Sequence, residues 1–310
     1  MKINRSMLTA ALVGAAAYLT LNLCSVPALA QAPAGSAPQS LAGQGRIGGH
    51  FSADPRAQIR TYHLDGANID VPYCVFASSK VSRTKAAPLI VSLHGLGAGP
   101  QIMCNTTAVD LAQEGGYILV APMGYSIAGW YGSPVINLRG RGPRGAGSAP
   151  SATAAADSAP AAGPSNQDIQ KWSEEDVMNV LAMMRKEFNV DAKRIYLTGH
   201  SMGGAGTIFL ASKHADLWAA VAPVAPASFM MNQNRAEILK AIKDADLPIL
   251  FVQGDADSVV APANTRMWVD TAKELGLNYQ YAELPGIDHG PVITASQKDV
   301  YAFFGRYSKK

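Results

Sequence analysis

The sequence is poor in cysteine, in charge and in metal-binding motifs. It has three cysteines among 310 residues, and 16% of its residues are charged. Because it contains neither a His-Glu-x-x-His motif nor a paired Cys-x-x-Cys array, it predicts no metal site. Its formal net charge is +3, and no cluster of lysine and arginine alternates with aromatic residues. These absences argue against a metalloprotein and against a nucleic-acid-binding protein.

The first 30 residues have the pattern of a secretory signal peptide. Lys2 and Arg5 precede an apolar stretch over residues 7–23. Ala28-Leu29-Ala30 supplies the small residues of a cleavage site. We therefore expect cleavage after Ala30 and a secreted or periplasmic protein.

Two alternatives to cleavage fit this segment less well. A membrane anchor needs a longer uninterrupted apolar run, and Asn22 breaks this one. A lipoprotein anchored at Cys24 needs a small residue before the cysteine, where this chain has Leu23. We therefore expect no stable membrane anchor. Cleavage removes two basic and no acidic residues, which leaves 280 residues with a net charge of +1.

Two tracts of simple composition flank or interrupt the part of the chain that can fold. Residues 31–45 form an Ala/Pro/Gly/Gln tether, and residues 143–166 form an Ala/Pro/Ser/Gly tract. We expect residues 46–310 to be one α/β domain that carries the second tract as an insertion. The insertion is either a disordered surface segment or a mobile flap over a cleft, and its composition favours the first.

Short apolar strands alternate with amphipathic helices from about residue 58 onward. The predicted strands are 58–64, 71–77, 89–93, 117–122, 194–197, 219–226, 248–254 and 279–284. The predicted helices are 106–114, one that begins at the capping pair Ser173 and Asp176, 235–243, 264–275 and 296–307. This alternation predicts an open, mostly parallel sheet, with the loops at the carboxyl ends of its strands along one edge.

The segment 194–204 contains the pattern Gly-x-Ser-x-Gly between a strand and a helix. Gly199 and Gly203 leave room for a sharp turn, so Ser201 lies at the tip of that turn. The amide of Met202 begins the following helix and lacks an intrahelical partner, so it can donate to a developing negative charge. This nucleophile elbow predicts a serine hydrolase.

An acid and a base follow the serine in the order that this architecture uses. Asp257 comes in the loop after the strand 248–254, and His289 comes in a glycine-flanked loop after the strand 279–284. Asp255 competes for the role of the acid. We prefer Asp257, because its spacing from the preceding glycine resembles the acid loop of known hydrolases, and interpret Asp255 as a turn residue.

The strand 89–93 runs into His94-Gly95-Leu96 and further glycines. A glycine-rich loop at this place can aim the Leu96 amide inward, beside the Met202 amide, to form an oxyanion hole. The spacing of its glycines does not match the dinucleotide-binding fingerprint, and no Lys-Ser/Thr pair follows. The sequence therefore does not favour nucleotide binding.

These features together resemble the α/β-hydrolase superfamily from about Gln58 to the C-terminus. The phrases at 93–97, 130–132 and 191–204 are similar to those of secreted feruloyl esterases and poly(3-hydroxybutyrate) depolymerases. The resemblance implies the α/β-hydrolase fold, a mostly parallel central sheet with helices on both faces. It also implies a catalytic triad of Ser201, Asp257 and His289.

The expected function is that of a secreted serine carboxylic-ester hydrolase that works through an acyl-enzyme and needs no cofactor. Its substrate is a small or polymeric ester: a short-chain, phenolic or polyester one. Because the chain ends soon after its last helix, we expect soluble or short-chain esters more than polymers. A secreted serine peptidase and an acyltransferase are the alternatives on the same fold. A noncatalytic binding protein is less favoured, because all three triad positions are filled.

Two further pairs have two interpretations each. Trp130 and Tyr131 lie in a glycine-flanked loop, where they either contact the substrate or pack in the core. Cys74 and Cys104 remain after cleavage and are either joined in a disulfide or buried as free thiols.

Overall fold

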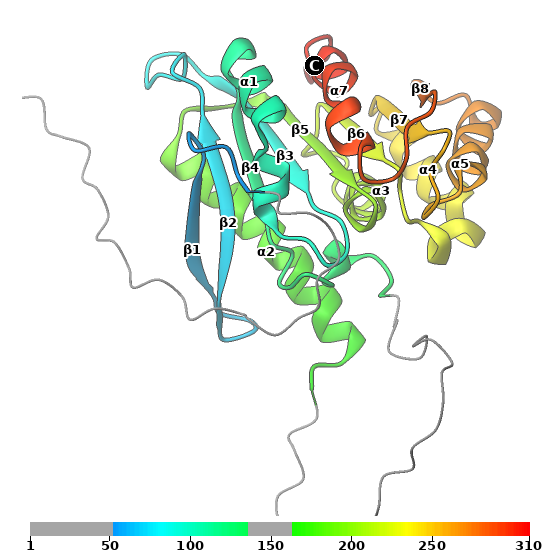
Figure 1. Cartoon of the computed structure of the whole chain (residues 1–310), viewed down its shortest axis with the longest axis horizontal. Helices are drawn as coiled ribbons and strands as arrows, with labels where there is room; N and C mark the ends of the chain where they lie inside the picture. Colours follow the sequence, from blue (N-terminus) through cyan, green and yellow to red (C-terminus); the bar gives the residue numbers. More distant parts are fainter. Residues whose placement is uncertain (1–51, 136–162) are drawn as a thin grey trace, which may run out of the picture. The chain divides into compact units, whose positions relative to one another are not determined.

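Eight strands form a single, mostly parallel sheet (Figure 1). They are β1 (Gln58–Leu64), β2 (Ile69–Ala77), β3 (Ala87–Leu93), β4 (Ile118–Pro122), β5 (Val190–His200), β6 (Ala220–Val224), β7 (Ile249–Gly254) and β8 (Tyr279–Leu284). Their order across the sheet is β1-β2-β4-β3-β5-β6-β7-β8. β2 is antiparallel to both of its neighbours, and the other adjacent pairs are parallel.

This computed structural model describes residues 52–135 and 163–310. The described residues belong to one compact unit, Ile47–Lys310. The predicted signal peptide and the tether at 31–45 lie outside the described residues, as does most of the tract at 143–166.

Helices cover both faces of the sheet (Figure 1). They are α1 (Thr106–Gly115), α2 (Asn166–Glu187), α3 (Met202–Lys213), α4 (Arg235–Asp244), α5 (Pro262–Leu275), α6 (Val292–Ala295) and α7 (Gln297–Phe304). The core on one face contains buried side chains of α2 to α5, among them Val177, Ile208, Leu239 and Trp268. The core on the other face is built by α1, α6 and α7. The arrangement confirms the α/β class and the strands predicted from the sequence.

The central strands are buried along their whole length because helices lie above and below them. Every residue of β3, β4, β6 and β7 is buried, which explains why these strands read as continuous apolar runs. β1 lies at an edge of the sheet, and most of its residues are exposed or half-buried.

The start of α2 differs from the prediction. The helix begins at Asn166, with a capping box between Ser165 and Asp168, and not at the pair Ser173 and Asp176. The same Ser-x-x-Asp spacing occurs twice, and the first copy lies at the end of the tract that we assigned to an insertion. Ser173 and Asp176 are instead buried inside the helix.

A disulfide joins Cys74 of β2 to Cys104 at the end of the short helix Pro100–Cys104. The two cysteines are 30 residues apart and are fully buried. Closing a loop of this length stabilises the fold by about 3.5 kcal/mol, mainly by restricting the unfolded chain. The bond holds the segment after β3 against the outer strands of the sheet.

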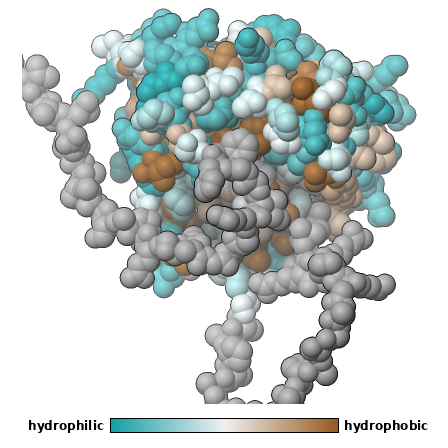
Figure 2. Space-filling model, in the orientation of Figure 1, coloured by the Kyte–Doolittle hydropathy of each residue, from teal (hydrophilic) through white to brown (hydrophobic). Residues whose placement is uncertain are grey.

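The surface of the described part is mixed in character. Figure 2 shows apolar residues in small groups that hydrophilic residues separate on the face in view. No helix within 52–135 and 163–310 is both long and apolar enough to cross a membrane.

Candidate active site

Ser201 lies at a sharp turn between β5 and α3. Its backbone angles, φ 58° and ψ −114°, fall outside the regions that a serine normally adopts. The surrounding packing must therefore hold this conformation. The strained turn brings the side chain of Ser201 to the carboxyl end of β5, where it remains mostly buried.

Two glycines make this turn possible. A Cβ atom on Gly199 would lie 2.3 Å from the carbonyl oxygen of Gly203. A Cβ atom on Gly203 would lie 2.2 Å from the carbonyl oxygen of Leu93. Both contacts are with backbone that cannot move away cheaply, so only glycine fits at either position. The Gly-x-Ser-x-Gly pattern thus follows from the close approach of β3, β5 and α3.

Three side chains from three loops form a chain of hydrogen bonds. The Ser201 hydroxyl lies 3.0 Å from Nε2 of His289, and Nδ1 of His289 lies 2.8 Å from Oδ2 of Asp257. Because a carboxylate can only accept, Nδ1 carries the proton and Nε2 accepts from the hydroxyl. The structure therefore brings together the serine, base and acid that the sequence singled out.

Four donors hold the carboxylate of Asp257. Its Oδ1 accepts from the amides of Val259 at 2.9 Å and Val260 at 2.7 Å. Its Oδ2 accepts from Nε2 of Gln253 at 2.9 Å, in addition to the imidazole of His289. With every lone pair engaged, the carboxylate is fixed in orientation although it is buried.

The acid loop (residues 255–260) and the base loop (residues 285–290) are tied together. Oδ1 of Asp288 accepts from the amide and hydroxyl of Ser258, both at 2.9 Å, and from the amide of His289 at 2.7 Å. The hydrogen bond from the Ser258 amide contributes most to lowering the pKa of Asp288, and the other two lower it further. Asp255 accepts from the Gly286 amide at 2.6 Å and does not contact the imidazole of His289. Its side chain thus links the acid loop to the base loop.

His200 packs directly beneath His289. Its Nε2 donates to the carbonyl oxygen of His289 at 2.9 Å, and the two rings are 4.5 Å apart. Burial, reinforced by the nearby charge of His289, lowers the pKa of His200 to about 3. His200 therefore stays neutral at physiological pH and supports the backbone of the base loop.

This buried neutral histidine makes folding sensitive to acid. The pKa of His200 lies below its unfolded value of 6.5, so the stabilisation is present above pH 6.5 and is lost as the pH falls toward 3. We expect wild type to lose about 2 kcal/mol of unfolding free energy between pH 7 and pH 5 through this group. His200→Gln should not show that component in urea titrations at the two pH values. Equal losses in the two proteins would contradict this assignment.

The two residues predicted to form the oxyanion hole come from different elements, because Met202 begins α3 directly after Ser201 and Leu96 follows β3. Met202 is the first residue of α3, so no carbonyl one turn earlier accepts from its amide. Leu96 follows β3 in the β3 loop (residues 94–97), which the Gly97 amide anchors to the carbonyl of Ile127 at 2.8 Å. Within the described residues neither amide donates to another backbone group.

A second loop, which follows β4 (residues 123–133), supports the β3 loop. The hydroxyl of Tyr131 accepts from the amide of His94 at 3.0 Å. The amide of Tyr131 in turn donates to Oγ of Ser173 at 2.6 Å. Asp176 accepts from the Gly124 amide and from the hydroxyl of Tyr62. Ser173 and Asp176, which do not cap α2, thus attach this second loop to the helix.

Trp130 and Tyr131 are both buried, with left-handed backbone φ angles of 62° and 52°. Their rings are packed in the core under the β3 loop and present no exposed face to a ligand.

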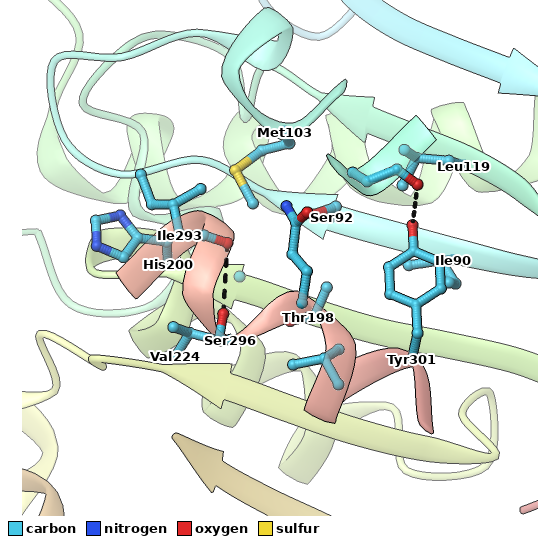
Figure 3. Close-up of a pocket in the computed structure, with 14 residues that line it drawn as sticks. Ile90, Ser92, Met103, Leu119, Thr198, His200, Val224, Ile293, Ser296 and Tyr301 are labelled. Carbon is cyan, nitrogen blue, oxygen red and sulfur yellow. Dashed lines mark hydrogen bonds between the residues drawn. The ribbon is translucent and has the colours of Figure 1, made fainter. Parts of the chain in front are cut away.

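A small cavity lies behind the elbow (Figure 3). Figure 3 shows His200 at one end of it and Tyr301 at the other, with Met103 and Ser296 between them. Its volume of about 20 Å³ holds about one water-sized molecule and is too small for an acyl chain. Ser201 is not among the residues that line it. In 52–135 and 163–310 no three His, Cys, Asp or Glu side chains are grouped to hold a metal ion.

Three supporting residues were not singled out from the sequence. Gln253 is a polar residue in a strand, His200 occupies the variable position of the elbow, and Asp288 is the neighbour of His289. Only Gln253 had a signal in the sequence, because it is a polar side chain in the otherwise apolar run of β7. A buried amide needs hydrogen-bond partners, so such a residue points to a polar contact.

Comparisons with known proteins find similarity to hydrolases. The prolyl oligopeptidase family matches residues 165–241, which include the elbow. A bifunctional acetylxylan esterase/xylanase from Neocallimastix patriciarum is 28% identical over 63% of this chain and 22% of that protein. Cutinase 1 from Thermobifida cellulosilytica is 31% identical over 32% of this chain and 34% of the cutinase. The chain therefore spans about a fifth to a third of the length of these curated relatives.

Solved structures share the fold. A ferulic acid esterase from Anaeromyces mucronatus, in complex with ferulic acid, superimposes with a TM-score of 0.54 at 18% identity. The match covers 85% of this chain and 93% of the esterase. At this identity the likeness concerns the arrangement of the sheet and helices.

Proposed function

We propose that this chain, a member of the α/β-hydrolase superfamily, is a serine hydrolase that cleaves carboxylic esters. The observation that carries the proposal is the hydrogen-bonded series Ser201, His289 and Asp257 at the carboxyl ends of β5, β8 and β7. Similarity to esterases and cutinases supports the ester as the bond that is cleaved.

In the proposed reaction, the Ser201 oxygen attacks the ester carbonyl while Nε2 of His289 takes the hydroxyl proton. Asp257 keeps the imidazole in the required tautomer and stabilises the imidazolium that forms. His289 then gives its proton to the leaving alcohol. Water attacks the acyl-enzyme with His289 again as the base, which releases the acid and restores Ser201.

The negative charge on the carbonyl oxygen needs donors during both steps. We assign this role to the amides of Leu96 and Met202, the second of which also lies at the positive end of α3. The β3 loop contributes Leu96 through its backbone, so the side chain at that position is free to face the substrate.

Exposed apolar side chains at this edge of the sheet favour an apolar ester. Leu96 after β3 is 40% exposed, and Val259 after β7 is 65% exposed. Phe229 and Met230 after β6 are 44% and 61% exposed. β3 and β6 flank β5 in the sheet and β7 lies next to β6, so these residues follow strands that end at the same edge of the sheet as β5. They supply apolar contact to a phenolic, polyester or medium-chain acyl group. We therefore propose an apolar ester as the substrate instead of the soluble or short-chain ester expected from the sequence.

A series of esters tests this proposal. We expect hydrolysis of p-nitrophenyl acetate, butyrate and octanoate and of methyl ferulate, with kcat/KM highest for an apolar ester. The double substitution of Phe229 and Met230 to serine should lower kcat/KM for octanoate about tenfold more than for acetate. Met267→Ser, which changes an exposed methionine on α5, is the matched control. An equal loss on both esters would contradict the apolar contact.

The match to the prolyl oligopeptidase family favours a second candidate, a serine peptidase. The matched segment covers the elbow, which esterases and peptidases of this fold share. A chromogenic peptide anilide in the same assay separates the two, since a peptidase would cleave it with a kcat/KM comparable to that for esters.

We further propose that the chain is exported. The pattern of residues 1–30 and the disulfide between Cys74 and Cys104 support export, because disulfides persist in oxidising compartments. N-terminal sequencing of the protein from the periplasm or medium should begin at Gln31.

A further inference from the structure

We propose that Gln253 is a positioning residue that holds the acid of the hydrolase site and sets the pH at which the site becomes active. This inference rests on the proposed function. Gln253 is a fully buried amide on β7, four residues before Asp257. It contacts the carboxylate and not the substrate, so it acts through Asp257.

The amide has one orientation that satisfies its neighbours. Its Oε1 accepts from the hydroxyl of Thr265 on α5 at 2.6 Å. Its Nε2 therefore faces the acid loop, where it donates to Oδ2 of Asp257 at 2.9 Å and to the carbonyl of Val260 at 3.2 Å. Exchanging the two ends would place the amide oxygen against a carboxylate oxygen, which repels it.

Gln253 and His289 donate to the same oxygen of Asp257. Because Oδ2 receives both Nε2 of Gln253 and Nδ1 of His289, the amide fixes the direction in which this oxygen faces the imidazole. The amide dipole also offsets part of the negative charge at that oxygen. Removing the donor leaves an underused lone pair in a buried site, and adding a charge there changes how readily the imidazole takes a proton.

The other titratable groups near Asp257 and His289 do not mask the effect of Gln253 on the pH profile. His200 packs against His289 from the end of β5, and burial keeps the pKa of His200 near 3. Asp288 on the base loop has a lowered pKa. Asp255 on the acid loop accepts from the amide of Gly286. His200 stays neutral and Asp288 stays charged across the range where a histidine-dependent rate rises.

One substitution at Gln253 separates positioning from packing. Gln253→Met keeps the volume and loses the donor, so we expect kcat for the best ester to fall roughly tenfold to a hundredfold with KM within about threefold. The lost donor leaves more negative charge on Oδ2 of Asp257, which stabilises the imidazolium, so the acid limb of the kcat/KM profile should move to higher pH.

Thr265 provides a check that does not require changing Gln253. Thr265→Val removes the hydroxyl that orients the amide and should lower kcat severalfold, whereas Thr265→Ser keeps the hydroxyl and should retain most of the activity. Asn264→Leu is the matched control. It removes a buried amide on the same helix that bonds Pro226, Ser228 and Asn232 and no member of the hydrolase site. The folded control should keep the wild-type acid limb.

The outcomes distinguish this inference from the proposed function. If wild type hydrolyses no ester, the proposed function fails. If wild type is active and folded Gln253→Met keeps kcat within threefold or leaves the acid limb in place, the role of Gln253 is wrong. If Gln253→Met does not fold, the pair of Thr265 variants decides.

Discussion

Ser201→Ala should lower kcat for ester hydrolysis on the order of a millionfold while leaving the fold intact. The substitution removes the one oxygen that lies 3.0 Å from Nε2 of His289. Alanine tolerates the backbone of this turn as well as serine does, because the strain arises at the backbone and Cβ that both residues share. Initial rates with a chromogenic ester, combined with thermal unfolding, measure the effect.

Ser212→Ala is the matched control for this experiment. Ser212 lies in α3, the helix that follows Ser201, and its hydroxyl donates to the carbonyl of Phe209. We expect wild-type kcat in this variant. A folded Ser201→Ala protein that retained more than a thousandth of the activity would contradict the role of Ser201 as the nucleophile.

Asp257→Asn should lower kcat about ten thousandfold. Asparagine fills the same space and can still accept from the amides of Val259 and Val260. It lacks the charge that stabilises the imidazolium, and its amide group favours the wrong tautomer of His289. The loss should appear mainly in kcat, because the carboxylate does not touch the substrate.

Asp255→Asn tests the choice between the two aspartates. Asparagine retains an oxygen that accepts from the Gly286 amide, so this variant should keep kcat within about threefold. If Asp255→Asn proved as damaging as Asp257→Asn, the acid would be wrongly assigned. Similar unfolding midpoints in the two variants would show that the difference concerns the chemistry.

Much of the fold could be predicted because parallel strands that helices cover on both faces must be apolar throughout. The fully buried β4 and β7 each begin one residue after the strands predicted at 117–122 and 248–254. The edge strands β1 and β8, which are less buried, have the predicted bounds. The elbow could also be predicted, because the space for a sharp turn requires glycine at 199 and 203. Features of this kind depend on residues that are neighbours in the sequence, so the sequence alone predicts them.

The hydrogen bonds that support the site could not be predicted in the same way, because they join residues far apart in the sequence. His200 contacts a carbonyl 89 residues later, and Tyr131 binds Ser173 across 42 residues. The start of α2 was wrong for a different reason. Two Ser-x-x-Asp pairs are equally good caps locally, and only the packing of Ser173 and Asp176 against the loop after β4 excludes the second.

The most direct test of the account is covalent labelling with a fluorophosphonate, which reacts with a serine that a neighbouring base has activated. Intact mass and peptide mapping of the folded protein should show one adduct per chain, on Ser201. Labelling should be absent in Ser201→Ala and much slower in Asp257→Asn. An adduct on another residue, or no adduct on folded wild-type protein, would contradict the account.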